Sequence, residues 1–392
     1  MSDQNVQPDT CSATCPDNST DKQDTAGEKL DAIRKAIDSV DCELLALLNF
    51  RTQLSKQVGE IKAGGDAPIY CPGRERELMD RLQEMNGGPL PNEHLLRIYT
   101  EILASSRAMQ RPLQAACLGP AGTFSYLAAH DFLGKSTNLE PLPNLESVFS
   151  SVADAKTQLG VVPLENSLQG SVGQSLDLFL LYAVHISAEF FYRVQHSLLF
   201  TGQNVNEIKK IYSHPQPLAQ CSGWLNSHLP NVPLFTAEST AQAAQLAANE
   251  AGAAAIGHNN LASLYNLNVV AENIEDQANN WTRFAVIAPG FVDLAKPSVA
   301  DQADQKTTLL FTLNNTPGAL AAVLNIITNA RLNLSKLESR PALYGNGAEN
   351  WSYTFFADVD ANLLNKPEIL AELKTCCHFL RVLGVYSLGR KL

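Results

Sequence analysis

The stretch VVPLENSLQG, residues 161–170, joins a short apolar segment to a run of polar and turn-forming residues. Val161 and Val162 are typical of the end of a buried parallel strand, which is covered by helices on both faces. Polar side chains just past such a strand lie where open α/β sheets bind ligands. The stretch therefore predicts either a ligand-binding loop at a sheet edge or an ordinary strand-to-helix loop in which Asn166 or Ser167 caps the next helix.

Other stretches of the chain show the same combination of a strand or helix pattern with a polar or glycine-bearing loop. They are GPAGTFS (119–125), YSHPQPLAQC (212–221), AEST (237–240) and NWTRFAVIA (280–288). Short strands alternate with helical patterns through this region, which is typical of an α/β sheet. We therefore expect two α/β lobes over residues 114–297, with the loops facing a cleft between the lobes. The predicted strands include 115–118, 159–162, 208–212 and 254–256.

The composition limits the class of protein to which the chain belongs. A length of 392 residues indicates two to four domains, and 45% hydrophobic with 18% charged residues is ordinary for a globular protein. The formal net charge of −11 argues against nucleic acid as a partner. The chain contains no apolar run long enough to span a bilayer and no apolar signal core, so no membrane association is expected.

The cysteines and the common ligand motifs exclude further classes. The eight cysteines are scattered, with Cys376 and Cys377 adjacent, which favours reduced thiols in a cytoplasm over a disulfide framework. The sequence has no GxGxxG, P-loop or spaced CxxC pattern, so it predicts neither a nucleotide cofactor nor a metal site. Cys11 and Cys15 lie in a polar segment, residues 1–27, that we expect to be a disordered tail.

Residues 28–113 have the pattern of an all-helical domain. Apolar residues recur at spacings of three and four over 28–63, which predicts a helix of roughly 50 Å that a Gly-Gly pair ends. Two shorter helices are expected over 73–85 and 93–109. Three such helices enclose little core, so a homodimer that completes a bundle is predicted. This domain holds 12 of the 29 lysines and arginines, whereas residues 114–296 hold 7, so a dianionic ligand has more cations available here.

The last part of the chain predicts a third domain. Residues 292–305 are a polar linker, and residues 304–392 follow the βαββαβ pattern of a ferredoxin-like α+β domain. Its strands are expected at 307–313, 332–338, 351–359 and 381–387, and its helices at 317–330 and 367–378. The predicted fold class is therefore multidomain, with an all-α, a two-lobed α/β and an α+β part.

Four motifs in order, GPAGTFS, VVPLENS, SHPQP and TRF, resemble prephenate dehydratase over roughly residues 113–297. The resemblance implies an enzyme that removes the ring hydroxyl and ring carboxylate of prephenate, giving phenylpyruvate, water and carbon dioxide. Thr282 is then the proton donor for the leaving hydroxyl or the group that orients the donor. Arg283 either binds a substrate carboxylate or only ties its strand to a neighbour. The other residues implied to line the substrate site are Thr123, Glu165, Asn166, Ser213, His214 and Gln220.

The helical domain resembles the all-helical chorismate mutase that precedes the dehydratase in bifunctional proteins. Arg51 and Lys62 are three helical turns apart and share a face. Arg34 points to another face, which suits the family arrangement in which this arginine reaches the partner subunit's site. Cys71 stands where some relatives carry an acid. The active-site set implied by the resemblance is Arg34, Arg51, Lys62, Arg74, Glu75, Ser106 and Gln110.

The reaction implied for this domain, chorismate to prephenate, is an intramolecular rearrangement that needs no nucleophile, metal or cofactor. The protein has to restrict the conformation of the substrate and aim charges at the breaking ether oxygen. Arginines suit the two carboxylates of the substrate. Lys62 and Gln110 would donate to the ether oxygen, and Glu75 would accept from the ring hydroxyl.

TPGAL (316–320) and NLSKLESRP (333–341) resemble the ACT domain of phenylalanine-regulated dehydratases. Pro317 is expected as the first helical residue, and Gly318 would let the backbone approach a small ligand closely. Two such domains are expected to pair in the dimer, and the alternative is a stabilising domain without a ligand. The regulatory phenylalanine site implied by the resemblance is Gly318, Ala319, Leu320, Asn333, Glu338, Ser339, Arg340 and Pro341.

These features predict a bifunctional mutase and dehydratase with feedback inhibition by phenylalanine. One alternative keeps only the dehydratase and makes the helical domain a dimerisation arm, with Cys71 as its support. Another is an amino-acid-binding sensor or transport protein, since two-lobed α/β clefts often serve that purpose. Incubation with chorismate, with prephenate and phenylpyruvate followed separately, distinguishes the three.

Overall fold

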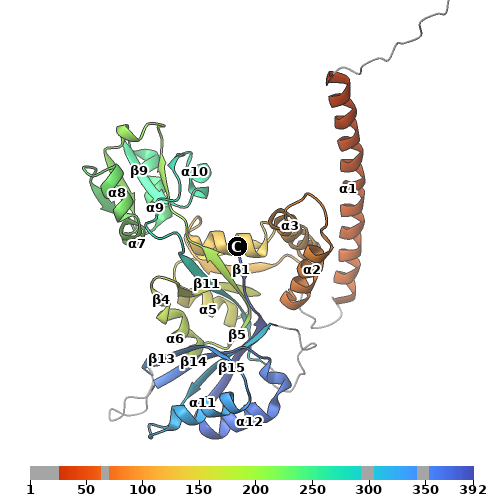
Figure 1. The fold of residues 1–392 in the computed structure, drawn as a ribbon, viewed down its shortest axis with the longest axis vertical. Helices are drawn as coiled ribbons and strands as arrows, with labels where there is room; N and C mark the ends of the chain where they lie inside the picture. The colour runs from red at the N-terminus through yellow and green to blue at the C-terminus, as the bar shows by residue number, and fades with distance from the viewer. Residues whose placement is uncertain (1–25, 63–69, 293–303, 342–352) are drawn as a thin grey trace, which may run out of the picture. The chain divides into compact units, whose positions relative to one another are not determined.

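The computed structural model describes residues 26–62, 70–292, 304–341 and 353–392 (Figure 1). Residues 1–25 of the predicted tail, the Gly-Gly helix stop and most of the predicted linker lie outside these residues. The prediction that residues 26 and 27 are disordered is wrong, because a helix begins at Ala26. The chain forms two compact units, Met1–Leu54 and Ser55–Leu392. Within the described residues, no helix is long and apolar enough to cross a membrane.

The helical part of the chain has the three predicted helices. They are α1 (Ala26–Lys62), α2 (Pro72–Met85) and α3 (Asn92–Gln110). Pro72 stands at the start of α2, where its missing N–H group costs no hydrogen bond. No residue of α1 is buried, and its apolar stripe, which includes Ile33, Ile37 and Leu44, is exposed. Within the described residues, this apolar stripe is therefore left exposed.

The first lobe is built on a mixed sheet whose main path is β16-β5-β11-β3-β1-β2, with β4 pairing only to β3. Buried apolar residues cover both faces of this sheet and hold three helices against it. The strands are β1 (Gln114–Leu118), β2 (Asn138–Leu142), β3 (Leu159–Asn166), β4 (Gly170–Ser171), β5 (Val184–Arg193), β11 (Trp281–Pro289) and β16 (Arg390–Lys391), and the helices are α4 (Phe124–Leu133), α5 (Leu145–Ala153) and α6 (Gly173–Leu181).

β3 differs from the predicted strand in its length and in one partner. Its first part pairs parallel with β1, as expected, but its other edge pairs antiparallel with β11 from residue 160 to residue 166. Glu165 and Asn166 therefore lie within the strand, and the prediction that they follow its end is wrong. The added strand partner supplies backbone hydrogen bonds that the sequence of β3 alone does not reveal.

The second lobe has the sheet order β10-β6-β9-β7-β8. The chain enters it after β5 and leaves it before β11, and the two crossings run side by side. Val194 N–H donates to Asn280 O at 2.9 Å, and Ile274 N–H donates to His196 O at 3.0 Å. The elements are β6 (Ser197–Phe200), η1 (Val205–Glu207), β7 (Lys210–Ser213), α7 (Pro215–Gln220), α8 (Ser222–His228), β8 (Leu234–Thr236), α9 (Thr240–Asn249), β9 (Ala253–Gly257), α10 (Asn260–Tyr265) and β10 (Asn268–Ala271).

The C-terminal region has the βαββαβ connection, with sheet order β13-β14-β12-β15. Gly318 precedes the first helix in a left-handed conformation, with φ 84°, and Pro317 lies in the turn before it. The prediction that Pro317 is the first helical residue is therefore wrong, because the helix begins at Ala319. The elements are β12 (Gln305–Thr312), α11 (Ala319–Asn329), β13 (Leu334–Pro341), β14 (Tyr353–Val359), η2 (Leu363–Asn365), α12 (Pro367–Cys376) and β15 (Phe379–Ser387).

The C-terminal sheet shares a core with the first lobe. Its helices cover one face, while Leu310, Phe356 and Leu383 on the other face join the cluster formed by α5, α6, β3, β5 and β11. A Cβ atom on Gly384 of β15 would lie 2.2 Å from the carbonyl oxygen of Ile186, so glycine permits this close approach. The two regions are thus packed as one body, despite the linker predicted between them.

Candidate active sites

Asn166 and Thr282 meet on neighbouring strands of the first sheet. β3 and β11 place Asn166 opposite Thr282 and Glu165 opposite Arg283. Asn166 Nδ2 donates to Thr282 Oγ1 at 3.1 Å and to Asn280 Oδ1 at 2.7 Å. Asn166 Oδ1 accepts from the backbone N–H groups of residues 168 and 169 at 3.0 and 3.2 Å. Both ends of the amide are engaged, and this fixes the direction of the N–H group that faces the Thr282 hydroxyl.

Glu165 and Arg283 point to the opposite face of the same strands, because side chains alternate along a strand. Arg283 is buried and contacts Glu189 of β5 at 2.5 Å and Asp358 of β14 at 2.7 Å. Glu165 lies 3.9 Å from Arg283 and accepts from Lys336 Nζ of β13 at 2.6 Å. This geometry favours the second of the two roles predicted for Arg283, that of tying its strand to neighbouring elements.

The charge states on this face follow from its contacts. Burial opposes the charge of Arg283, but Tyr386, Asp358 and Glu189 outweigh burial and raise the pKa of this guanidinium above its usual value. Burial, followed by Asp358 and Glu189, raises the pKa of Tyr386, whose hydroxyl accepts from Arg283 Nη2 at 3.2 Å. Lys306 Nζ adds a second cation, 3.2 Å from Glu189. Two cations thus oppose two buried carboxylates, which reduces the cost of burying them.

Three other predicted substrate residues are engaged in local hydrogen bonds. Ser213 is buried and donates to Ile256 O at 2.8 Å. His214 caps α7 by accepting a backbone N–H at Nδ1, 3.3 Å away. Thr123 caps α4 and also donates to a backbone carbonyl of β1 at 3.1 Å. Each side chain therefore orients a strand end or a helix start within its own lobe.

Gln220 bonds a histidine that the sequence reasoning overlooked. His196 is buried in the first crossing between lobes, with Nε2 2.8 Å from Gln220 Oε1, and its ring meets Phe124 edge-on at 5.4 Å. Burial lowers the pKa of His196 and favours its neutral ring. Asn280, also overlooked, is buried in the second crossing and accepts from Asn166. A sequence feature that could have indicated His196 and Asn280 is their location, because each is a polar residue directly before a strand.

Loops of the first lobe contact the second lobe. Gln216 Nε2 of α7 donates to Gln169 Oε1 at 3.0 Å. A Cβ atom on Gly122, whose φ is +87°, would lie 2.6 Å from the side chain of Leu261 in α10. Glycine therefore lets the GPAGTFS loop approach the second lobe closely. These contacts join the loops after β1 and β3 to the second lobe, near the Asn166–Thr282 pair.

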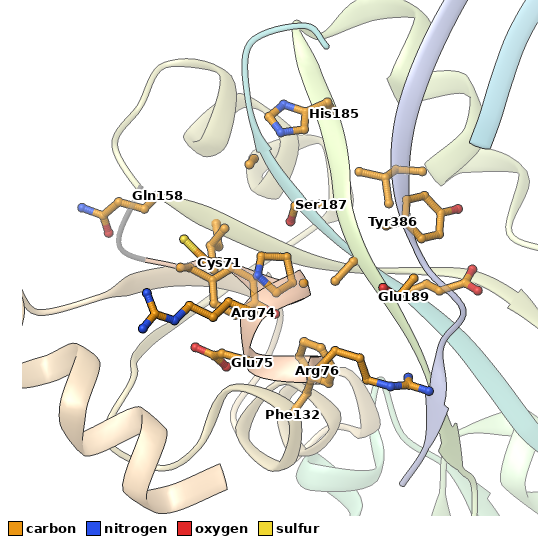
Figure 2. Close-up of a pocket in the computed structure, with 18 of the residues that line it drawn as sticks. Cys71, Arg74, Glu75, Arg76, Phe132, Gln158, His185, Ser187, Glu189 and Tyr386 are labelled. Atoms are coloured by element: carbon orange, nitrogen blue, oxygen red, sulfur yellow. The ribbon is translucent and has the colours of Figure 1, made fainter. Parts of the chain in front are cut away.

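A cavity of about 1300 Å³ is lined by α2, α3, β5 and the residues around the end of β15. Figure 2 shows Arg74 and Glu75 of α2 beside it. Glu75 Oε1 lies 2.5 Å from Nη1 of Arg107, a buried residue of α3 that also donates to a backbone carbonyl at the end of α4. The sequence analysis did not select Arg107. Its position on the helix face that carries Leu103 and Ala104 could have indicated that it is buried.

Three more predicted residues of the helical part do not line this cavity. Ser106 is buried and donates to Ile102 O at 2.8 Å. Gln110 packs against α1, where a Cβ atom on Gly59 would lie 3.0 Å from Gln110 Cα. Lys62, at the end of α1, follows Gly59 by less than one turn. Gln110 thus faces α1, while Arg74 and Glu75 line the cavity.

Arg34 and Arg51 belong to the first compact unit, and the other five predicted residues belong to the second. Arg34 contacts Asp31 at 3.3 Å in an exposed pair one helical turn apart. Among the described residues, no group of three or more His, Cys, Asp or Glu side chains could hold a metal ion.

Comparison with known proteins identifies the family of the helical part and of the two-lobed part. The family model described as prephenate dehydratase matches residues 115–290, and chorismate mutase type II matches residues 33–111. A bifunctional chorismate mutase/prephenate dehydratase of Aquifex aeolicus is 38% identical over 92% of this chain and 98% of its own length. The chain belongs to the bifunctional chorismate mutase/prephenate dehydratase family. Its helical part is the mutase domain, and its two lobes form the dehydratase domain.

Two solved structures resemble about 70% of this chain in fold. A prephenate dehydratase from Arthrobacter aurescens in complex with L-Phe has a TM-score of 0.63 and 29% identity, covering 71% of this chain and 90% of its own. A structure described as GqqA, a novel type of quorum quenching acylase, has a TM-score of 0.61 and 28% identity, covering 70% of this chain and 98% of its own.

The residues predicted to bind phenylalanine are divided between two places in the C-terminal region. Gly318, Ala319 and Leu320 form the turn and the start of α11. Asn333 donates to Asp360 at 2.6 Å. On the edge strand β13, Glu338 accepts from Ser171 at 2.9 Å and Arg340 bonds Asp177 at 2.8 and 2.9 Å, so both contact the dehydratase domain. Ser339 and Pro341 pair with Phe355 and Tyr353 of β14.

Proposed function

We propose that the chain converts chorismate to prephenate at its mutase domain and prephenate to phenylpyruvate at its dehydratase domain. Family membership over 92% of the chain supports both activities. Neither step requires a cofactor, because the first is a rearrangement within one molecule and the second is driven by aromatisation. A cytoplasmic location is part of the proposal. It is supported by the described cysteines, which are all free thiols, as is usual in a reducing compartment.

The hydrogen bond between Asn166 and Thr282 is the observation that carries the dehydration proposal. Prephenate loses its ring carboxylate as carbon dioxide, and the electrons released aromatise the ring as the hydroxyl leaves with a proton to form water. The Asn166 N–H group bonds the oxygen of Thr282 at 3.1 Å, which leaves the hydroxyl proton of Thr282 directed away from Asn166. Thr282 can then donate this proton towards the leaving hydroxyl, or orient the group that does.

Product analysis tests the two activities together. Purified protein is mixed with chorismate, and prephenate and phenylpyruvate are quantified separately over time. We expect prephenate to appear first and phenylpyruvate to follow. Phenylpyruvate formed from added prephenate but not from chorismate would support the dehydratase-only alternative, in which the helical domain is a dimerisation arm.

The likeness to an acylase offers a rival activity for the same fold. Acyl transfer by a side-chain hydroxyl needs a base within hydrogen-bond reach of that hydroxyl. The Thr282 hydroxyl instead receives an N–H group from the Asn166 amide, which is not a base. The acylase structure also covers 70% of this chain, whereas the bifunctional relative covers 92%. Dehydration is therefore favoured.

A homodimer that completes the mutase site is the next part of the proposal. The exposed apolar stripe of α1 supports it, because such a face is normally buried against another helix. Arg34 would act in the partner's site, since its helical phase differs from that of Arg51 and Lys62. Mixing the inactive variants Arg34→Ala and Arg51→Ala should restore part of the mutase activity in heterodimers. Proven subunit exchange without any recovery would contradict this arrangement.

Phenylalanine is proposed as an inhibitor that binds the C-terminal region as an ACT domain. The relative of known structure that binds L-Phe supports this, and the N-terminal end of a helix such as α11 suits a carboxylate. Removal of residues 304–392 would be a poor test, because Leu310 and Phe356 belong to a core shared with the dehydratase. Gly318→Val in the full chain is preferable, since φ of 84° disfavours a branched residue. We expect weaker inhibition by phenylalanine with dehydratase activity retained. Unchanged inhibition that competes with prephenate would place phenylalanine in the dehydratase site instead.

A further inference from the structure

Asn166 lies in a short hairpin formed by the end of β3 and by β4. In this hairpin Glu165 pairs with Ser171 and Asn166 pairs with Gly170. Gly170 has φ of +78°, which suits the tight turn between the two strands. Isolated two-stranded hairpins are marginally stable, and within the described chain β4 has no second strand partner. The position of Asn166 therefore depends on β11 at one edge of β3 and on the hairpin at the other.

Lys336 of the C-terminal edge strand β13 bridges the base of this hairpin. Its Nζ atom lies 2.6 Å from Glu165 Oε2 and 3.2 Å from Ser171 Oγ, so one ammonium group contacts both strands of the hairpin. Ser171 Oγ in turn donates to Glu338 of β13 at 2.9 Å. The Lys336 side chain is 16% exposed and that of Glu165 is 38% exposed, so the ammonium group is mostly shielded from water while the carboxylate is partly open to it.

The bridge and the Asn166 amide lie on opposite sides of the strand. Glu165 points towards the C-terminal sheet, and Asn166, the next residue, points towards Thr282. Lys336 therefore meets the carboxylate of Glu165 on the face away from Thr282. An effect of Lys336 on dehydration must pass through the position of the hairpin.

We propose that Lys336 is a positioning residue for the dehydration reaction, because it fastens the Glu165–Ser171 hairpin and so holds the Asn166 amide on Thr282 Oγ1. This inference rests on the proposed role of Thr282. It assigns to the C-terminal sheet a direct part in shaping the dehydratase site. A ligand that moved β13 would move Asn166 as well.

The test compares Lys336→Met with Lys336→Arg in the full chain. The methionine keeps the length and most of the volume but cannot bond Glu165 or Ser171, whereas the arginine can donate to both oxygens. Misplacement of a group in an active site by about 1 Å can cost 10²-fold in rate. For Lys336→Met we expect a dehydratase kcat about 10- to 100-fold lower with KM within about twofold, because transition-state stabilisation is lost while substrate binding is kept. Lys336→Arg should recover most of the kcat.

Two measurements separate positioning from general damage. The mutase rate of Lys336→Met should equal that of the parent protein. Arg381→Met is the matched control, because Arg381 also joins the C-terminal sheet to the dehydratase, through the carbonyls of Phe179, Tyr182 and Val184, but does not touch the hairpin. Its dehydratase kcat should stay within about twofold of the parent value, well short of the loss expected for a misplaced group.

If Lys336→Met folds poorly, Ser171→Ala replaces it, since it removes one oxygen of the bridge and should lower the dehydratase kcat by a smaller factor. The proposal is overturned by a parent-like kcat in Lys336→Met, by an equal loss in Arg381→Met, or by an arginine variant as impaired as the methionine one. Thr282→Ala is assayed in parallel. Parent-like dehydratase activity in Thr282→Ala would refute the proposed function itself, whereas loss there with an unaffected Lys336→Met would refute only the role of Lys336.

Discussion

The two faces of the β3–β11 strand pair differ in charge although the residues on them are neighbours in sequence. One face carries the neutral groups of Asn166, Asn280 and Thr282, joined by hydrogen bonds of 2.7 and 3.1 Å. The other carries Glu165 and Arg283 in an ionised network with residues of β5 and the C-terminal sheet. One pair of strands thus supplies a neutral site on one side and an electrostatic joint between domains on the other.

If Thr282 has its proposed role, one compact motif serves chemistry and assembly together. In TRF, Thr282 and Arg283 are adjacent, and strand alternation alone sends them to opposite faces. The buried ion pairs of Arg283 affect stability in a different way. A paired buried charge is often neutral for stability, whereas an unpaired one is strongly destabilising. Substitutions on the face of Arg283 should therefore change the free energy of unfolding, and substitutions on the face of Thr282 should change the dehydratase rate.

The largest expected effect is on the ionised face. Arg283→Met would leave Glu189 and Asp358 buried, with Lys306 as the cation that still contacts both among the described residues. We expect the free energy of unfolding to fall by about 3–5 kcal/mol, measured by urea denaturation. Arg283→Lys is the control and should lose less, since it keeps the charge. An unchanged urea midpoint together with a raised KM for prephenate would instead indicate that Arg283 binds a substrate carboxylate.

The next effect is on the neutral face. Thr282→Ala should lower dehydratase activity by about 10²-fold or more, the range for a positioned proton donor, and prephenate should accumulate from chorismate. Thr282→Ser keeps the hydroxyl and should retain much of the activity. The urea midpoint should change little, in contrast to Arg283→Met. Parallel loss of mutase and dehydratase activity in Thr282→Ala would indicate misfolding and remove the distinction between the faces.

Acid should also destabilise the crossing between the two lobes, which lies outside both faces. Burial lowers the pKa of His196, so below about pH 6.5 the unfolded chain binds a proton that the folded chain does not. Stability from this neutral ring is present above about pH 6.5 and is lost as pH falls towards the lowered value, by at most about 1.4 kcal/mol per pH unit. Denaturation midpoints from pH 7.5 to 5 should show a smaller slope for His196→Gln than for the parent. Identical slopes would mean that His196 does not contribute.

The smallest expected effect tests a hydrogen bond within the ionised network. Tyr386→Phe removes a hydroxyl that bonds Thr308 at 2.5 Å and Arg283 at 3.2 Å. We expect a loss of about 0.5–1.5 kcal/mol in the free energy of unfolding, because the charges of the network remain paired. A loss as large as that of Arg283→Met would show that Tyr386 is central to the network rather than peripheral.

Much of the architecture was predictable from local pattern. The spacing of apolar residues located α1, α2 and α3 to within two residues, and the βαββαβ order of the last region followed from alternating strand and helix signals. The ordered motifs also indicated the family before any comparison. Within the site, Thr282 and Asn166 were both named from the sequence, and they are hydrogen-bonded.

The direction and partners of individual side chains were not predictable in this way. Arg107, His196 and Asn280 were overlooked, since burial and pairing with distant residues decide their importance. Lys336 lies in the NLSKLESRP stretch, but local pattern did not indicate its contact with Glu165, which is far away in the sequence.

The sequence by itself determined most helices and strands and the family motifs, because these depend on short-range periodicity and on residue type. Only the tertiary structure decided that β3 extends to Asn166, since that extension requires hydrogen bonds from β11. It alone also decided that Glu165 and Arg283 face the C-terminal sheet, where Lys336 and Asp358 meet them. These contacts join residues far apart in the chain, and chain folding rather than local preference brings such residues together.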